Sequence, residues 1–334
     1  MTNASLRWSA GPGAVPSGKG NPMPELRLRT VTRTQGANLA LKEGTIAPAH
    51  ARLEFVEVSP LVQAFRRMVR GLEFDVCELS VTTYLAAKAH GARFTALPVF
   101  LVRGFHHQAI QVAADSGLRP EDLVGRRVGV SRGYTVTTGV WARGVLADEY
   151  GVDLDAVTWA LSGDEHVAEF VPPPNVEPAG GDLGELLAAG ELAAVIGADL
   201  KGPGVRPLIP DPFEAGVAAL RRDGFHPVNH LVVVRDELLD AHPGLAEDLF
   251  AAFSRAKTEY VDALRAGGVT EPTAADRTNA RVAEVTGRDP LPYGLEPNRA
   301  VLEKLLDHAL AQHILDDRPD LDTLFAKGTH GLEG

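Results

Sequence analysis

The sequence predicts an α/β protein built as two lobes, and three observations support this expectation. The chain has 334 residues, more than the ~100–200 of a typical single domain. Short apolar runs typical of strands alternate with segments of helical pattern, as in layered α/β folds. The alternation restarts after Pro120, and a late apolar run at 228–235 adds one more strand. We therefore expect two lobes joined by two chain crossings, with a cleft between them.

Composition and charge exclude several classes of protein. Hydrophobic residues make up 45% and charged residues 23%, which fits a globular protein that buries a core. The net charge of −11 repels nucleic acid and anionic membranes, so neither is an expected partner. Cys77 is the one cysteine, so no intramolecular disulfide forms, as in reducing compartments. No apolar stretch approaches the ~20 residues of a membrane span, and the N-terminal residues lack the apolar core of a secretory signal. We expect a cytoplasmic protein. Its sequence is compatible with a homo-oligomer.

The first series of elements supplies most of lobe 1. Its expected strands are 26–31, 51–58, 74–79, 94–103 and 109–114, and its expected helices are 37–44, 59–71 and one that begins after Ser80. Residues 1–22, rich in Gly, Pro and Ser, are expected to form a disordered tail.

The second series supplies lobe 2, and the chain then returns to lobe 1. The expected strands are 126–131, 158–162, 193–198, 205–209 and the return strand 228–235; the expected helices are 135–149, 183–190, 243–267, 298–313 and 320–327. The Pro-rich segment 171–181 indicates a surface loop. Lobe 1 is thus expected to comprise 23–115 and 231–334, and lobe 2 to comprise 116–230.

In such a fold the ligand lies between the lobes, in the loops that follow the strands. One of these loops has a turn at Gly133 and then Thr135, Thr137 and Thr138 at the start of a helix. Free backbone N–H groups, hydroxyls and the helix dipole favour a carboxylate or phosphate there. Plain N-capping by threonine is an equally weighted alternative.

A second loop has the sequence RGFHHQ at 103–108. Arg103 is suited to bind a carboxylate with two hydrogen bonds, and histidine exchanges protons near neutral pH. Alternation along an extended chain places His106 and His107 on opposite faces, so one of them is expected to face the cleft. A structural role is the more frequent alternative for such a pair.

A third segment, FHPVNH at 225–230, places His226 and His230 four residues apart. Pro227 and the following valines favour entry into a strand, so the helical spacing of a metal pair does not apply. Glu78, at the end of the strand 74–79, is the best carboxylate for the cleft, although an acid at a helix start also complements the helix dipole. A metal site formed by Glu78, His106 and His230 is a weak alternative, and it would bind a divalent metal ion.

Five long segments in one order carry a resemblance to a known family. They are FDVCELSVTTYLAAKAHG, ALPVFLVRGFHHQAIQV, GLRPEDLVGRRVGVSRGYTVTTGVWARGVLADEYGV with VTWALSG, FHPVNHLVVVRDELLDAHPGLAEDLFAAFSRAK, and YGLEPNRAVLEKLL. Together they resemble the 4,5-dihydroxyphthalate decarboxylase family, which is similar in fold to the type II periplasmic solute-binding proteins. The resemblance covers about Leu26 to Ala326. It departs at His106, where the family has arginine, and at 162–166, where the family has Gly-Gly-Leu-Glu-Glu.

The resemblance implies a cytoplasmic decarboxylase of a hydroxylated aromatic or related cyclic acid, without an organic cofactor. Such a reaction needs a proton donor for the ring carbon, a base for a ring hydroxyl, and cations that hold the carboxylates. The expected catalytic residues are His107 as general acid and Glu78 or His230 as the partner of the hydroxyl. The expected substrate-binding residues are Arg33, Ser80, Tyr84, Arg103, His106, Thr135, Thr137, Thr138, Trp141 and His226. A solute-binding protein of an uptake system and a binding or biosynthetic protein that uses the cleft differently are the alternatives.

Overall fold

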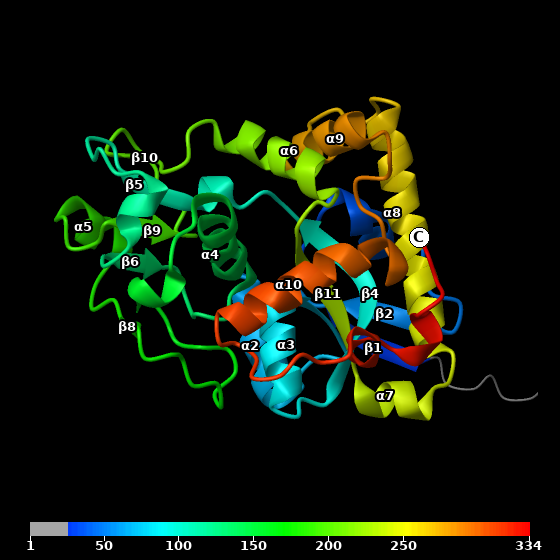
Figure 1. Ribbon diagram of the computed structural model, residues 1–334. Helices are drawn as coiled ribbons and strands as arrows, with labels where there is room; N and C mark the ends of the chain where they lie inside the picture. Colours follow the sequence, from blue (N-terminus) through cyan, green and yellow to red (C-terminus); the bar gives the residue numbers. More distant parts are fainter. Residues whose placement is uncertain (1–25) are drawn as a thin grey trace, which may run out of the picture.

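The computed structural model describes residues 26–334, so the tail expected at 1–22 lies outside the described residues. Two β-sheets occupy separate halves of the molecule (Figure 1). The strands are β1 (Leu26–Val31), β2 (Ala51–Phe55), β3 (Val76–Ser80), β4 (Phe94–Arg103), β5 (Ile110–Ala113), β6 (Arg127–Val130), β7 (Thr158–Leu161), β8 (Val176–Pro178), β9 (Ala194–Ile196), β10 (Val205–Pro207) and β11 (Val228–Arg235). The expected two-lobed α/β class is confirmed.

Each sheet is mostly parallel, with antiparallel strands where the chain crosses between lobes. The first sheet has the order β2-β1-β3-β11-β4, and β11 runs antiparallel to both of its neighbours. The second has the order β10-β5-β9-β6-β7-β8, and β5 runs antiparallel to β9 and β10. The chain crosses once between β4 and β5 and returns between β10 and β11. β5 therefore belongs to the second lobe, which corrects the boundary expected at residue 115, and β11 from Val228 belongs to the first.

Helices cover both sheets. They are α1 (Leu39–Glu43), α2 (Val62–Gly71), α3 (Val81–Ala89), α4 (Thr137–Tyr150), α5 (Leu183–Ala188), α6 (Pro212–Asp223), α7 (Asp236–Ala241), α8 (Leu245–Arg265), α9 (Ala274–Thr286) and α10 (Arg299–Ala311). The segment expected as a helix at 320–327 contains a short 3-10 turn at Leu321–Leu324. α6, α7 and α9 were not expected, and β8 lies in the segment expected as a loop.

The edge strand β4 shows how local sequence fits the topology. Pro98 lies inside it, and proline cannot donate a ladder hydrogen bond, so it is tolerated at edges and bulges. Within the sheet β4 is hydrogen-bonded to β11, and the register shifts between Val228 and His230 and again between His230 and Val232. Pro98 is therefore accommodated without leaving a donor of a central strand unpaired.

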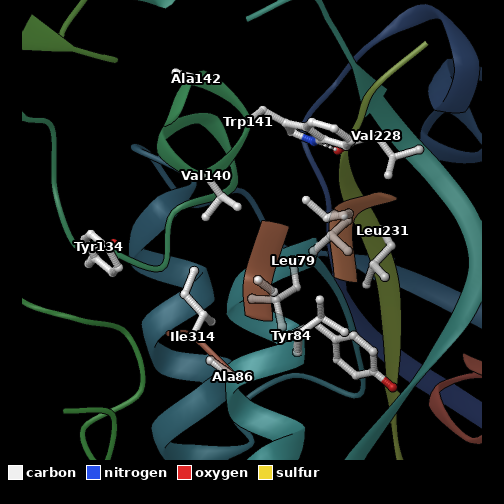
Figure 2. Close-up of a cluster of buried hydrophobic side chains, with 14 of the residues drawn as sticks. Leu79, Tyr84, Ala86, Tyr134, Val140, Trp141, Ala142, Val228, Leu231 and Ile314 are labelled. Carbon is white, nitrogen blue, oxygen red and sulfur yellow. Dashed lines mark hydrogen bonds between the residues drawn. The ribbon is translucent and has the colours of Figure 1, made fainter. Parts of the chain in front are cut away.

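One hydrophobic cluster continues from the first lobe into the second. Figure 2 shows Leu79 and Leu231 of the first sheet facing Val140 and Trp141 of α4. The indole nitrogen of Trp141 donates to the carbonyl of Val228 at 2.8 Å, across the lobes. The lobes are thus packed against each other behind the loops that follow the strands.

Candidate active site

Three of the expected residues meet where neighbouring strands of the first sheet end. Arg33 follows β1, Glu78 lies in β3, and His230 lies in β11. In the β3–β11 register, Ser80 pairs with His230 and Val232 pairs with Glu78. Glu78 and His230 are therefore diagonal neighbours on one face of the sheet, within reach of each other. We call Arg33, Glu78 and His230 the carboxylate–histidine cluster.

Short hydrogen bonds connect this cluster. Arg33 donates its backbone N–H to Glu78 Oε2 and its Nε–H to Glu78 Oε1, both at 2.8 Å. His230 Nδ1 lies 2.6 Å from Glu78 Oε1 and 3.0 Å from a terminal nitrogen of Arg33. The Glu78 side chain is fully buried, whereas the Arg33 side chain is 38% exposed. The buried Glu78 carboxylate is thus paired with a guanidinium group that is partly exposed to solvent.

The pKa values indicate how the protons are distributed. Burial alone would raise the Glu78 pKa, but the hydrogen bond from His230 and the charges of His230 and Arg33 outweigh it, so the pKa is lowered. Burial lowers the pKa of His230 and outweighs the opposite effect of Glu78. Near neutral pH we therefore assign an ionised Glu78 and a neutral His230. The Nδ1–H of His230 then donates to Glu78, so the Arg33 nitrogen 3.0 Å from Nδ1 is a close contact and not a second hydrogen bond. The Nε2 lone pair is available as a base.

The loops of the second lobe bring two further polar residues toward the cluster. The ring of Phe65 lies edge-on to His230 at 5.1 Å and edge-on to His166 at 6.2 Å. Arg132 follows β6 and lowers the pKa of both histidines after the larger effect of burial. Among residues 26–334 no carboxylate pairs with Arg132, and Nδ1 of His166 is buried without a partner. From the sequence, Arg132 was expected only to add positive charge to the anion site at Thr135, and His166 was not selected; the signal for His166 was the departure from the family pattern at 162–166.

The start of helix α4 binds a carboxylate, as the hydroxyl pattern suggested, but the carboxylate belongs to the protein. Glu165 accepts hydrogen bonds from the backbone N–H of Tyr134, and from the N–H and hydroxyl of Thr135 at 3.2 and 2.6 Å. A Cβ at Gly133 would lie 2.7 Å from Glu165 Oε2, so glycine permits this close approach. In this structure the Glu165 carboxylate occupies the anion site expected at Thr135.

Hydroxyls at the same helix start connect the lobes. Ser80 Oγ lies 2.6 Å from Thr137 Oγ1, and the Thr82 hydroxyl donates to the Thr135 carbonyl at 2.5 Å. Ser80 and Thr137 were expected to bind substrate; here they hydrogen-bond to each other. Thr138 is half-buried, with no side-chain hydrogen bond inside the described range.

Helix α2 also holds the loop that carries Glu165 and His166. Arg66 donates two hydrogen bonds to the Asp164 carboxylate, at 2.9 and 2.6 Å. Arg70 donates to the carbonyls of His166 and Glu165, at 3.1 and 2.8 Å. The two lobes are therefore in direct polar contact beside the cluster.

The adjacent histidines lie differently from the expectation. His107 begins a 3-10 turn (His107–Ala109), so the alternation of an extended strand does not apply. Its Nε2 lies 3.1 Å from Glu149 Oε1 at the end of α4, and Arg222 pairs with the same carboxylate. This pairing does not bring His107 into the carboxylate–histidine cluster. His106 stacks on Trp141, and burial, then His107 and His230, lower its pKa to about 3.

Four other expected substrate contacts are engaged elsewhere. Arg103 donates to the carbonyls of His226 and Pro292, both at 2.9 Å, and with His226 it lines a separate cavity. Tyr84 lies fully buried beneath the first sheet, with its hydroxyl donating to the Leu324 carbonyl (Figure 2). Trp141 is buried between the lobes. Neither aromatic ring is free to stack on a substrate in this structure, because both complete the core.

Metal ligands are not clustered in the described part of the chain. Within residues 26–334, no group of three or more His, Cys, Asp and Glu side chains has the arrangement to hold a metal ion. The weak metal site considered for Glu78, His106 and His230 is therefore not assembled. In the same range no helix has the length and apolar character to span a membrane.

Comparisons with known proteins place the chain in a family. The chain is 34% identical over 270 residues to a 4,5-dihydroxyphthalate decarboxylase of Comamonas testosteroni, covering 74% of this chain and 81% of that protein. It is 36% identical over 146 residues to the enzyme of the same name from Pseudomonas putida, covering 40% and 56%. No family model matches the sequence.

Solved structures show the same fold at low identity. The aliphatic sulphonate-binding protein SsuA of Escherichia coli matches with a TM-score of 0.54 and 15% identity, covering 93% of this chain and 95% of that chain. The desulfurization enzyme DSZB in complex with biphenyl-2-sulfinic acid matches at 0.52 and 18%, covering 90% and 96%. A Candida albicans protein with the generic periplasmic binding protein fold matches at 0.52 and 13%, covering 93% and 99%. The chain therefore has the periplasmic-binding-protein fold and belongs to the 4,5-dihydroxyphthalate decarboxylase family, a family named for a carboxy-lyase reaction.

Proposed function

We propose that this protein decarboxylates a hydroxylated aromatic dicarboxylate of the 4,5-dihydroxyphthalate type where the two lobes meet. The observation that carries the proposal is the ionised Glu78 that orients a neutral His230, with Arg33 beside them and Arg132 opposite. The family relationship supplies the reaction class.

Two arginines supply the charge that a dicarboxylate needs. Arg33 uses its Nε–H for Glu78 and is partly exposed, so its remaining N–H groups can reach a substrate carboxylate. Arg132 is half-buried, and burial, then the charge of Arg33, lower its pKa, which places both cations in one region. A guanidinium binds a carboxylate through charge-assisted hydrogen bonds, the strongest class in proteins. We assign Arg33 and Arg132 to the two carboxylates.

In the proposed reaction one proton is removed from a ring hydroxyl and another is delivered to the ring carbon. His230 Nε2 takes the proton of the ring hydroxyl para to the carboxylate that leaves, and Glu78 stabilises the imidazolium. The oxygen lone pair moves into the ring, and the carbon that bears the carboxylate accepts a proton. The C–C bond breaks, carbon dioxide leaves, and the electron pair of that bond restores the aromatic ring.

His166 is our candidate for the donor to carbon. Burial and the charges of Arg66, Arg132 and Arg70 lower its pKa to about 4, and a bound dianion would raise it. His107, held by Glu149, is the alternative donor that sequence reasoning favoured.

The test is turnover of 4,5-dihydroxyphthalate by the full-length protein, followed by release of carbon dioxide. We expect turnover, and we expect Arg132→Gln to raise KM by about tenfold to a hundredfold, as for loss of hydrogen bonds to a charged group. Arg126→Gln, on an exposed arginine at the opposite end of β6 whose side chain donates to the Asp122 carbonyl, is the matched control. Binding without release of carbon dioxide would contradict the proposal and favour a solute-binding role for the same fold. A cytoplasmic location belongs to this proposal and is supported by the composition.

A further inference from the structure

A cavity of about 550 Å³ lies apart from the carboxylate–histidine cluster, with which it shares no lining residue. It is formed where both connections between the lobes leave the first sheet. Arg103, the last residue of β4, begins the first connection, and His226 lies just before β11 at the end of the second. This volume is within the range of ligand pockets in proteins.

Three arginines line this cavity, and Arg103 among them donates to the carbonyls of His226 and Pro292 and to the Asn298 side chain. Arg103, Arg221 and Arg288 line it, and none of them pairs with a carboxylate among residues 26–334. The acid Asp289 also lines it but is paired with Lys257. The cavity therefore carries excess positive charge in a protein whose net charge is −11.

His226 adds the second, independent sign of a missing ligand. Its side chain is 5% exposed, the Pro290 carbonyl faces the ring, and neither ring nitrogen has a hydrogen bond of standard geometry among the described residues. Nε of Arg103 is likewise buried without a partner. Unsatisfied buried polar groups cost free energy, and a ligand group that accepts hydrogen bonds would recover it.

The remaining wall is apolar. Leu220 of α6 and Val282 of α9 belong to one buried cluster, and both line the cavity together with Phe225 and Val301. Figure 1 shows α6 and α9 side by side at this edge of the molecule. A bare inorganic anion would leave these apolar side chains facing water, whereas a ligand with an apolar body would cover them.

We propose that this cavity binds a small amphipathic monocarboxylate, aromatic or branched aliphatic, with its carboxylate on Arg103 and His226 and its apolar body against α6 and α9. Arg221 and Arg288 are exposed and lie at the mouth. The site is separate from the place of catalysis, so it does not rest on the proposed function.

Calorimetric titration of the full-length protein with benzoate tests the site. We expect the double variant Arg221→Glu/Arg288→Glu to weaken benzoate binding at least tenfold. Arg265→Glu makes the same charge change on an exposed arginine outside the cavity, and we expect it to leave binding unchanged. Arg33→Gln, in the carboxylate–histidine cluster, is also expected to leave it unchanged. Because these residues are exposed or partly exposed, circular dichroism should show an intact fold in every variant.

Three results would overturn the proposal. They are absence of benzoate binding, equal affinity in the double variant, and loss of binding in Arg33→Gln, which would place benzoate at the catalytic cluster. Inorganic phosphate serves as a second probe: affinity equal to that of benzoate would overturn the amphipathic assignment. None of these results depends on turnover, so failure of this site and failure of the decarboxylase proposal are distinguishable.

Discussion

His226 and His230 flank Pro227, four residues apart, and have contrasting surroundings. Each is buried and each lies near an arginine, Arg103 for His226 and Arg33 for His230. Only His230 has a carboxylate, Glu78, within hydrogen-bond distance. The cluster with a carboxylate on its histidine has the parts for proton transfer, whereas the cavity, whose carboxylate Asp289 is paired with Lys257, has the parts for binding an anion. The same residue types therefore support different chemistry, depending on whether the fold supplies the negative charge.

The largest expected effect comes from removing that internal charge. Glu78→Gln keeps the shape of the side chain but no longer stabilises a protonated His230. We expect kcat to fall by about 10²–10⁴, the range for loss of acid–base catalysis. The matched control is Glu149→Gln, which changes the carboxylate beside His107 in the same way. A kcat for Glu78→Gln near that of the wild type would remove the cluster from the mechanism.

A second internal carboxylate, Glu165, stabilises the fold. Glu165→Ala leaves the N–H groups of Tyr134 and Thr135 without their acceptor, and hydrogen bonds to charged groups contribute about 1.5–3 kcal/mol each. We expect a loss of about 2 kcal/mol or more in the free energy of unfolding, measured in urea. Glu169→Ala, on an exposed glutamate of the same loop, should change it by less than about 0.5 kcal/mol. Equal effects of the two substitutions would contradict this role of Glu165.

Acid should destabilise the protein through its buried histidines. Burial lowers the pKa of His226 to about 3, and the pKa of His106 to about 3 and of His166 to about 4. The unfolded histidines take up protons below about pH 6.5, whereas these folded ones stay neutral, so stability is present above that pH and is lost as the pH falls. Each such histidine contributes a slope of about 1.4 kcal/mol per pH unit.

The variant His226→Gln isolates the contribution of His226 to this pH dependence. We expect the free energy of unfolding to fall less steeply between pH 6.5 and pH 5 in this variant, by the slope of one histidine. Urea unfolding at several pH values measures this difference. His50→Gln is the control, since His50 is exposed. An unchanged slope in His226→Gln would show that His226 is protonated in the folded state.

The smallest effect is expected at the exposed contact between the lobes. Asp164→Asn weakens the ion pair with Arg66. The Asp164 side chain is 66% exposed and the Arg66 side chain is 38% exposed. Exposed ion pairs contribute about 0–1 kcal/mol, so we expect the free energy of unfolding to change by less than about 1 kcal/mol. A loss above 2 kcal/mol would show that closure of the lobes depends on this pair.

Sequence patterns predicted much of the fold because apolar periodicity reports burial directly. The strands β4 and β11 have the bounds expected, 94–103 and 228–235. Helix α9 was missed because its sequence AADRTNARVAEVT buries only a narrow stripe against its neighbours. β8 was missed because a strand of three residues that ends in a proline is too short to show an alternation of apolar and polar side chains. The boundary at β5 depended on pairing with β9 and β10, which is not local information.

Sequence reasoning predicted the part of the candidate site whose residues are brought together by the order of the strands in the first sheet. Arg33 follows β1, Glu78 lies in β3, and His230 lies near the start of the antiparallel β11, so their meeting follows from the order of the first sheet. His107 was misplaced because a 3-10 turn replaced the extended chain assumed for it. The pairing of Glu165 with Thr135 depends on a loop conformation, which local patterns do not specify.

We expect proton transfer to depend on His230 rather than on His107. The most direct measurement is kcat for release of carbon dioxide from 4,5-dihydroxyphthalate by His230→Gln and by His107→Gln, at one pH. We predict a loss of about 10²–10⁴ for His230→Gln and a kcat within about tenfold of the wild type for His107→Gln. A near wild-type kcat for His230→Gln, together with the larger loss for His107→Gln, would contradict the account and move the chemistry to the pair of His107 and Glu149.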